Sequence, residues 1–191
     1  LEDYRISLLK YRYEQLYVNE RLDTAVSVDK VEEYYLAHKE SFRLERPLVK
    51  ARFLRIHTDS PMLETIRKKM DSSDANDLVE ADSLAFSSAM MFTTWQDEWQ
   101  DVIILAREMG MTYDSMLGQM RNGWVRQDDT TGVTNLAFVS EMLKSGDYAP
   151  MEYTSERIKD IIISTRKQAL ISSLEQDLLN DARENGKFVI Y

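Results

Sequence analysis

The feature that most limits the fold is an apolar repeat of helical period that continues through residues 155–185 without a break. A helix of that length extends over roughly 45 Å, which is more than a compact domain of this size needs. We therefore expect this helix to project from the chain or to bridge two parts of it. Its repeating side chains are Ile158, Ile162, Ala169, Leu170, Leu174, Leu178 and Ala182.

Helices should dominate the rest of the chain as well, because it holds only 6 glycines and 3 prolines in 191 residues. Ser27 and Thr112 are suited to cap the starts of two helices, and Gly110 is suited to end one. Besides the long helix, the expected helices cover residues 1–23, 27–41, 60–70, 74–85, 99–110, 112–120 and 134–146.

One strand is expected at residues 48–57, where Val49, Ala51 and Phe53 alternate with charged side chains. Residues 187–191 also have the composition of a strand and follow Gly186, which should end the long helix. The sequence therefore predicts a mainly α fold with a small β element that pairs residues 48–57 with 187–191.

Composition excludes several classes of function. The net charge of −9 disfavours nucleic acid as a partner, because an acidic surface repels phosphate. The absence of cysteine excludes disulfides, thiolate nucleophiles and cysteine-based metal sites. No stretch approaches the ~18 uncharged apolar residues of a membrane-spanning helix.

Neither histidine suggests catalysis. His38 falls late in an expected helix and His57 at the end of the expected strand, so they form no evident pair. Adjacent carboxylates such as Asp97 and Glu98 point apart on a helix, which is typical of a solvated face. We therefore predict no catalytic residue, no metal site and no cofactor.

The most distinctive apolar feature is a run of methionine and aromatic residues. Methionine adapts its shape and suits promiscuous apolar binding, although such a run is also typical of a packed core. The first helix adds a seam of tyrosine and leucine that suits either a core or a partner. The candidate peptide-binding residues are Met90, Met91, Phe92, Trp95 and Trp99, with position 12 (Arg12, between Tyr11 and Tyr13) and Leu16 from the first helix.

Three segments carry a resemblance to a known family. They are residues 26–35 (Val-Ser-Val-Asp-Lys-Val-Glu-Glu-Tyr-Tyr), residues 38–52 with Phe42 and the Ala51-Arg52 pair, and residues 166–191. Together they cover about half of the chain. In this order they resemble the SurA-like periplasmic peptidyl-prolyl isomerases and chaperones, a group related in fold to the trigger factor substrate-binding domain. The resemblance implies a discontinuous helical peptide-binding domain, residues 1–46 and 151–191, around an insert at the position of a parvulin domain, residues 47–150.

The insert departs from the family pattern. After the Ala-Arg pair the family has an active-site histidine, and this chain has Phe53. The Gly-Gly-rich loop is missing, and residues 153–158, where the second active-site histidine is expected, contain none. We therefore expect a degenerate insert, mostly helical.

The resemblance implies a non-catalytic chaperone of the periplasm or cell envelope that binds unfolded or outer-membrane polypeptides. A divergent prolyl isomerase is the alternative, and a four-stranded sheet within residues 48–157 would favour it. An envelope assembly or dimerisation protein is a third possibility. Self-association and a tether, lipid or otherwise, through a segment removed before Leu1 are left open.

Overall fold

The computed structural model describes residues 2–185, apart from the side chain of Arg121. The chain divides into two compact units, which are considered separately. The first consists of Leu1–Lys39 and Pro150–Tyr191, and the second is the continuous segment Glu40–Ala149. The first unit is therefore built from the two ends of the described chain, and the second is inserted between them.

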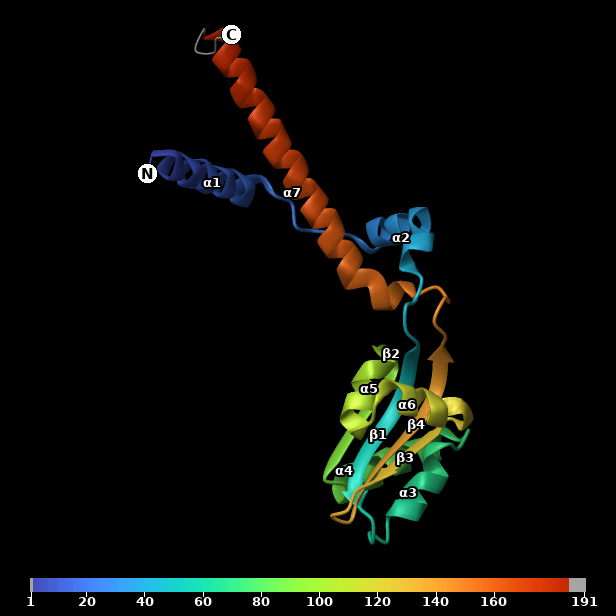
Figure 1. Cartoon of the computed structure of the whole chain (residues 1–191). Helices are drawn as coiled ribbons and strands as arrows, with labels where there is room; N and C mark the ends of the chain where they lie inside the picture. Colours follow the sequence, from blue (N-terminus) through green and yellow to red (C-terminus); the bar gives the residue numbers. More distant parts are fainter. Residues whose placement is uncertain (1, 186–191) are drawn as a thin grey trace. The chain divides into compact units, whose positions relative to one another are not determined.

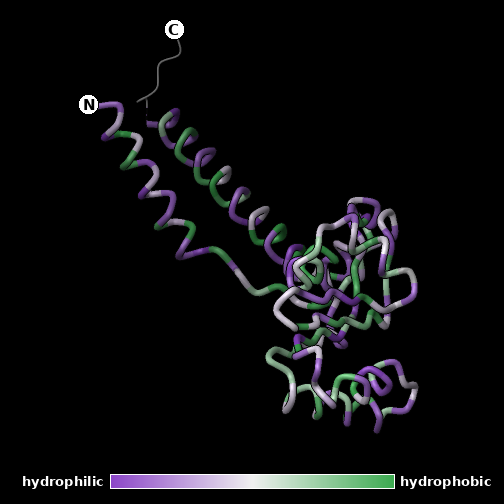
Figure 2. The backbone as a smooth tube through the Cα atoms, turned by 60° about the horizontal axis from the view of Figure 1, so that its bottom comes forward, coloured by the Kyte–Doolittle hydropathy of each residue, from purple (hydrophilic) through white to green (hydrophobic). Residues whose placement is uncertain are grey.

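The first unit contains three helices in its described part: α1 (Glu2–Arg21), α2 (Val28–Ala37) and α7 (Met151–Glu184) (Figure 1). The long C-terminal helix is confirmed, with 34 residues. The Ser27 side chain accepts a hydrogen bond from the Lys30 N–H, so the predicted cap of α2 is also confirmed. Figure 2 shows hydrophilic and hydrophobic stretches alternating along both long helices.

Contacts with α7 organise this unit. Arg166 donates hydrogen bonds from Nη1 to the carbonyls of Asp23 (2.9 Å) and Ala25 (2.7 Å), in the segment between α1 and α2. Lys10 on α1 pairs with Glu175 at 2.9 Å. The buried residues in the three helices are few: Val18, Val31, Thr154, Ile158 and Leu174.

The second unit is a four-stranded antiparallel sheet with helices on both faces (Figure 1). The strand order is β2-β1-β4-β3, so β1 lies between β2 and β4. The strands are β1 (Leu48–His57), β2 (Met91–Asp101), β3 (Trp124–Asp128) and β4 (Val133–Leu143). The helices are α3 (Leu63–Met70), α4 (Ala75–Ser88), α5 (Val102–Met109) and α6 (Tyr113–Gln119), with a short 3₁₀ turn at Met120–Asn122. A second 3₁₀ turn, Lys39–Phe42, begins one residue before this unit.

Each face of the sheet has its own core. Val49, Ala51 and Phe53 of β1 join a cluster with α5 and α6, which we call core A. Leu54 and Ile56 join a second cluster with α3 and α4, core B. Because both faces of β1 are covered, seven of its ten residues are buried, as is expected of a central strand.

The expected strand at residues 48–57 is confirmed, but its partners were predicted wrongly. Its neighbours are β2 and β4, and residues 187–191 lie outside the described part of the chain. The mostly helical insert is also wrong, since β2, β3 and β4 are strands. Residues 134–146 were expected as a helix that ends at Gly146 with Lys144 in its last turn, but residues 134–143 belong to β4, which includes Leu136, Ala137 and Val139. They are buried residues of β4, which is covered on both faces and therefore carries no clean alternation.

Candidate functional site

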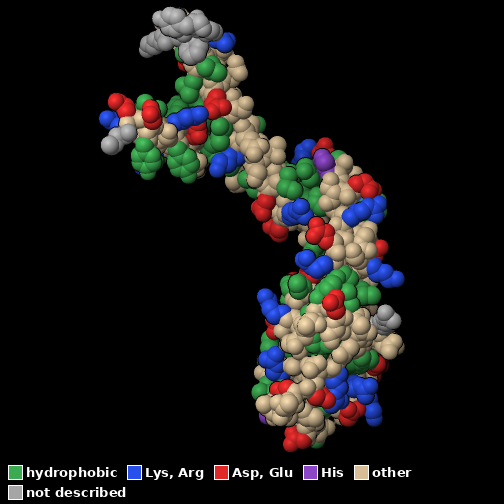
Figure 3. Space-filling model, viewed as in Figure 1, with side chains coloured by type: hydrophobic (Ala, Val, Ile, Leu, Met, Phe, Trp, Pro, Cys, Tyr) green, Lys and Arg blue, Asp and Glu red, His purple; other side chains and the backbone are tan. Residues whose placement is uncertain are grey.

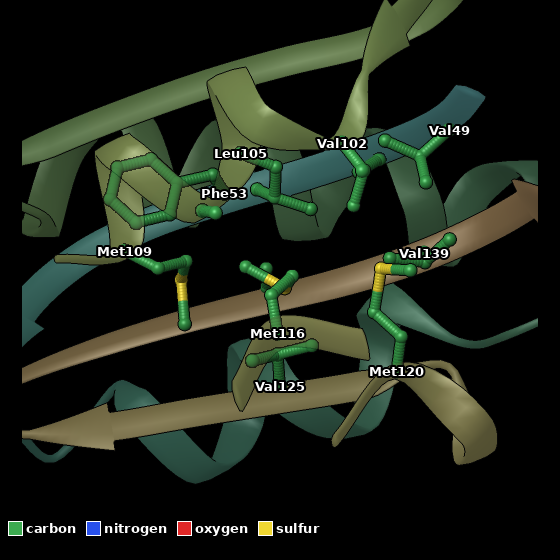
Figure 4. Packing of buried hydrophobic residues seen from close by; sticks show 12 residues of the cluster. Val49, Phe53, Val102, Leu105, Met109, Met116, Met120, Val125 and Val139 are labelled. Carbon is green, nitrogen blue, oxygen red and sulfur yellow. The ribbon is translucent and has the colours of Figure 1, made fainter. Parts of the chain in front are cut away.

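Phe53, at the position where the resemblance implied a histidine, is a core residue. Its relative exposure is 0%, and its ring lies among side chains of core A (Figure 4). Leu105 and Met109 of α5 and Met116 of α6 cover it from the helical side. Its register partner on β4 is Ala137, which offers no chemistry. The structure therefore shows a filled hydrophobic core here and no open cleft.

Arg55 closes one end of this core. Its Nε donates to Asn135 Oδ1 of β4 at 2.8 Å, and its Nη2 donates to the Glu108 carbonyl of α5 at 3.0 Å. The guanidinium lies 5.9 Å from the centre of the Phe53 ring. These contacts join β1, β4 and α5 around Phe53.

The two histidines lie apart, and His38 has a structural role. His38 is the C-cap of α2, its ring stacks on Tyr34 at 4.2 Å, and its Nδ1 lies 3.0 Å from the Tyr34 carbonyl. His57 is exposed at the end of β1, opposite Val133. The stretch at residues 153–158 forms the start of α7, so it is not a strand of the sheet. The strand that follows β3 is β4, and its sequence contains no histidine.

Within residues 2–185, no group of three histidine, cysteine or carboxylate side chains could hold a metal ion. No helix in this range is both long and apolar enough to cross a bilayer.

The candidate residues of the methionine and tryptophan run lie in or just before the edge strand β2, on both faces of the sheet. Trp95 packs against core A and Phe92 against core B, as the two-residue period of a strand requires. Met90 and Met91 are exposed, and Trp99 lies under the Lys50 ammonium at 5.0 Å. The structure thus separates these side chains, and a peptide-binding role for them stays a prediction.

The other two candidates, Arg12 and Leu16, lie together on α1. They line a hollow of about 570 Å³ with Leu8, Tyr11, Gln15 and Asn19. Figure 3 shows hydrophobic side chains protruding from this helix. Seven large apolar residues of α1 are at least 50% exposed: Tyr4, Ile6, Leu8, Leu9, Tyr11, Tyr13 and Leu16. We call these seven the α1 surface.

A further hollow, of about 450 Å³, was not predicted from the sequence. It lies between α4 and β2 and is lined by Val79, Asp82, Ser83, Phe86 and Phe92. Val79 and Phe86 are 66% and 83% exposed, although both are large and apolar. In the sequence, the only sign of this apolar surface is the spacing of seven residues between Val79 and Phe86, which places both on one side of α4.

Two ion pairs fasten the sheet to its surroundings. Arg52 is nearly buried, and its Nε lies 2.8 Å from Asp82 Oδ1 on α4. Asp101 accepts from the Ile103 N–H at the start of α5 and pairs with Arg46 at 2.6 Å. Burial acts to raise the pKa of Asp101, but the Arg46 hydrogen bond, the Ile103 N–H and the Arg46 charge outweigh it and lower that pKa.

Comparisons with known proteins show a distant likeness to solved structures. No family model matches the sequence. No curated protein matches it. The chain is similar to a solved structure of the SurA-like chaperones of the human pathogen Campylobacter jejuni, described as the virulence factor PEB4 and the periplasmic protein Cj1289. The identity is 15%, the match covers 100% of this chain and 73% of that chain, and the TM-score is 0.38. This is a distant likeness of fold, and it assigns no role to any residue.

Proposed function

We propose that the chain is a non-catalytic, SurA-like chaperone of the cell envelope that reversibly holds unfolded or extended polypeptides, outer-membrane proteins among them. The α1 surface carries the proposal. Seven large apolar side chains on a single helix are at least half exposed, and a soluble helix normally turns such residues toward a partner or a core. Charged residues, including Lys10, Arg12 and Glu14, lie between them and keep this helix hydrated.

The chemistry of the α1 surface suits weak and promiscuous capture. Tyrosine and leucine offer apolar area in several directions, and Arg12 in the α1 hollow can meet carboxylates or carbonyls of a client. Covering ~300 Å² of apolar surface would contribute roughly 7 kcal/mol at 25 cal/mol per Å². The cost of ordering a client offsets most of that gain, so the expected complex is short-lived and needs no energy source.

We propose that the chain is not a catalyst because Phe53 is fully buried in core A. A prolyl peptide has no access to this ring, because core A excludes even water from it. Opening core A to a peptide would expose the apolar side chains of α5 and α6 to water. The free energy of that exposure far exceeds the free energy that binding of a short peptide supplies.

Suppression of client aggregation tests the proposal. Guanidinium-denatured citrate synthase is diluted into buffer, and its light scattering is followed with and without the full chain. The wild type should lower the scattering, and the double variant Leu9→Ser/Tyr13→Ser should lose most of this effect. The matched control is Val28→Ser/Leu36→Ser on α2, where both residues are similarly exposed. Equal activity of the α1 variant and the wild type would refute the assignment to α1.

A divergent prolyl isomerase is the second candidate, and one observation favours it. The segment Glu40–Ala149 contains the four-stranded antiparallel sheet that a parvulin-type enzyme requires. Catalysis by a shaped pocket would not need a histidine. Isomerisation of a short proline peptide, measured beside the aggregation assay, separates the two candidates.

A further inference from the structure

We infer that the free edge of β2, together with the hollow beside α4, binds an extended client segment as an added strand. This goes beyond the proposed function, because it places a second polypeptide site in the unit formed by Glu40–Ala149. The occupant is a stretch of about five residues with apolar side chains at alternate positions and a basic residue at one end.

The backbone of β2 is available for pairing. In the described chain β2 lies at the end of the sheet and pairs with β1 alone. Met91–Trp95 keeps a regular register with β1, whereas Gln96–Trp99 is looped out of it. Every second residue of a regular edge strand directs its N–H and C=O outward, away from its neighbour. About five residues of β2 can therefore template another strand.

The regular part of this edge, residues 91–95, lacks the charges and prolines that usually protect an edge strand. Residues 91–95 (Met-Phe-Thr-Thr-Trp) contain no charged residue and no proline. Natural edge strands are commonly blocked by lysine, by proline or by an inward-pointing charge. An edge strand without these features in a well-packed unit favours addition of an extended peptide as a further strand.

The hollow supplies the contacts for side chains. Val79, Asp82, Ser83 and Phe86 recur at spacings of three and four, so they form one side of α4, and Phe92 of β2 completes the lining. A strand added ~4.8 Å beyond β2 would direct alternate side chains toward this side of α4. One apolar side chain of the client can then cover Val79 and Phe86, which are otherwise exposed.

Acidic residues in β2 favour a client segment that carries a positive charge. Asp97 and Glu98 are exposed immediately beyond the regular part of β2, and neither takes part in an ion pair within residues 2–185. Strand β2 contains no basic residue. A client with lysine or arginine beside its apolar stretch therefore complements this end, and a second copy of β2, which is equally acidic, does not.

Binding of one defined peptide to the full chain tests the inference. The probe is a fluorescein-labelled octapeptide, Lys-Thr-Val-Thr-Phe-Thr-Val-Thr, and the readout is fluorescence anisotropy. The double variant Val79→Ser/Phe86→Ser should bind it about tenfold more weakly, and Glu98→Lys about threefold. The control Val28→Ser/Leu36→Ser should bind like the wild type. Val79 and Phe86 are exposed, so their replacement should leave the fold intact.

Two N-methylated forms of the peptide test the backbone pairing itself. One is methylated at the odd positions and the other at the even positions, which blocks one edge of the strand in each case. Loss of binding by one form alone is expected, since an added strand pairs through a single edge. Equal binding by all three peptides would overturn the inference.

Two further outcomes would also overturn it, and they differ from failure of the proposed function. Weaker binding in Leu9→Ser/Tyr13→Ser, with Val79→Ser/Phe86→Ser unchanged, would place the peptide on α1 and leave the chaperone proposal intact. Light scattering that shows a wild-type dimer, lost in Val79→Ser/Phe86→Ser, would make a second copy the occupant of β2.

Discussion

Replacing Phe53 with alanine should remove about 3–5 kcal/mol from the free energy of unfolding of the Glu40–Ala149 unit. The ring is fully buried and is covered by Leu105, Met109 and Met116. Losing a buried aromatic side chain forfeits ~150–200 Å² of apolar burial, or roughly 4–5 kcal/mol at 25 cal/mol per Å². Collapse of methionine side chains into the space could recover part of this. A residue lining an open cleft would lose about 1 kcal/mol or less.

Urea unfolding followed by tryptophan fluorescence measures this change. All three tryptophans, Trp95, Trp99 and Trp124, lie within Glu40–Ala149, so the signal reports that unit alone. With a slope of about 1–3 kcal/mol per molar urea, the midpoint should fall by at least ~1 M.

Two further variants make the Phe53 measurement decisive. Phe53→Leu, at a cost of about 1 kcal/mol, provides a variant that still folds. The control Phe86→Ala removes an 83% exposed ring and should change the free energy by less than about 0.5 kcal/mol. A loss below about 1 kcal/mol in Phe53→Ala would refute the assignment of Phe53 to the core.

Three further predictions concern charged groups of the same unit. Asp101→Ala removes the cap of α5 and the partner of Arg46, and should cost about 1–2 kcal/mol in urea unfolding. Asp82→Ala leaves Arg52 nearly buried without its partner and should cost about 2–4 kcal/mol, whereas Arg52→Met should cost less. Hydrogen bonds from the Val133 N–H and then from the Thr131 hydroxyl lower the pKa of Asp129 in the folded chain. The ionised Asp129 therefore stabilises the fold fully above its unfolded pKa of about 4, and this stabilisation is lost as the pH falls through the lower folded pKa. Asp129→Asn should therefore flatten the acid limb of stability against pH, and an unchanged limb would contradict this.

Sequence patterns predicted the elements whose periodicity is simple. The helix α7 and the strand β1 were found because one repeats at the helical period and the other alternates over several residues. The helix ends were predicted by local chemistry, since Thr112 accepts from the Ser115 N–H and Gly110 adopts a left-handed conformation with φ of 68°.

The remaining strands depend on tertiary pairing. β3 has five residues and is mostly polar beyond Val125, so no pattern marks it, and its conformation follows from pairing with β4. The sequence did not decide whether the methionine and tryptophan run belongs to a core or lines a groove. In a strand its side chains point alternately to the two faces of the sheet, so Phe92 and Trp95 pack on opposite faces. The hollow beside α4 was not predicted, since the seven-residue spacing of Val79 and Phe86 does not by itself show that β2 is an edge strand beside them.

The rate of cis–trans isomerisation of a short proline peptide tests the central claim most directly. It should be measured with the full chain in excess and at the concentration that suppresses client aggregation. We predict the uncatalysed rate, with relaxation over tens to hundreds of seconds at 25 °C, while aggregation is still suppressed. Acceleration that scales with the concentration of the chain would contradict the account and would make the Glu40–Ala149 unit an enzyme.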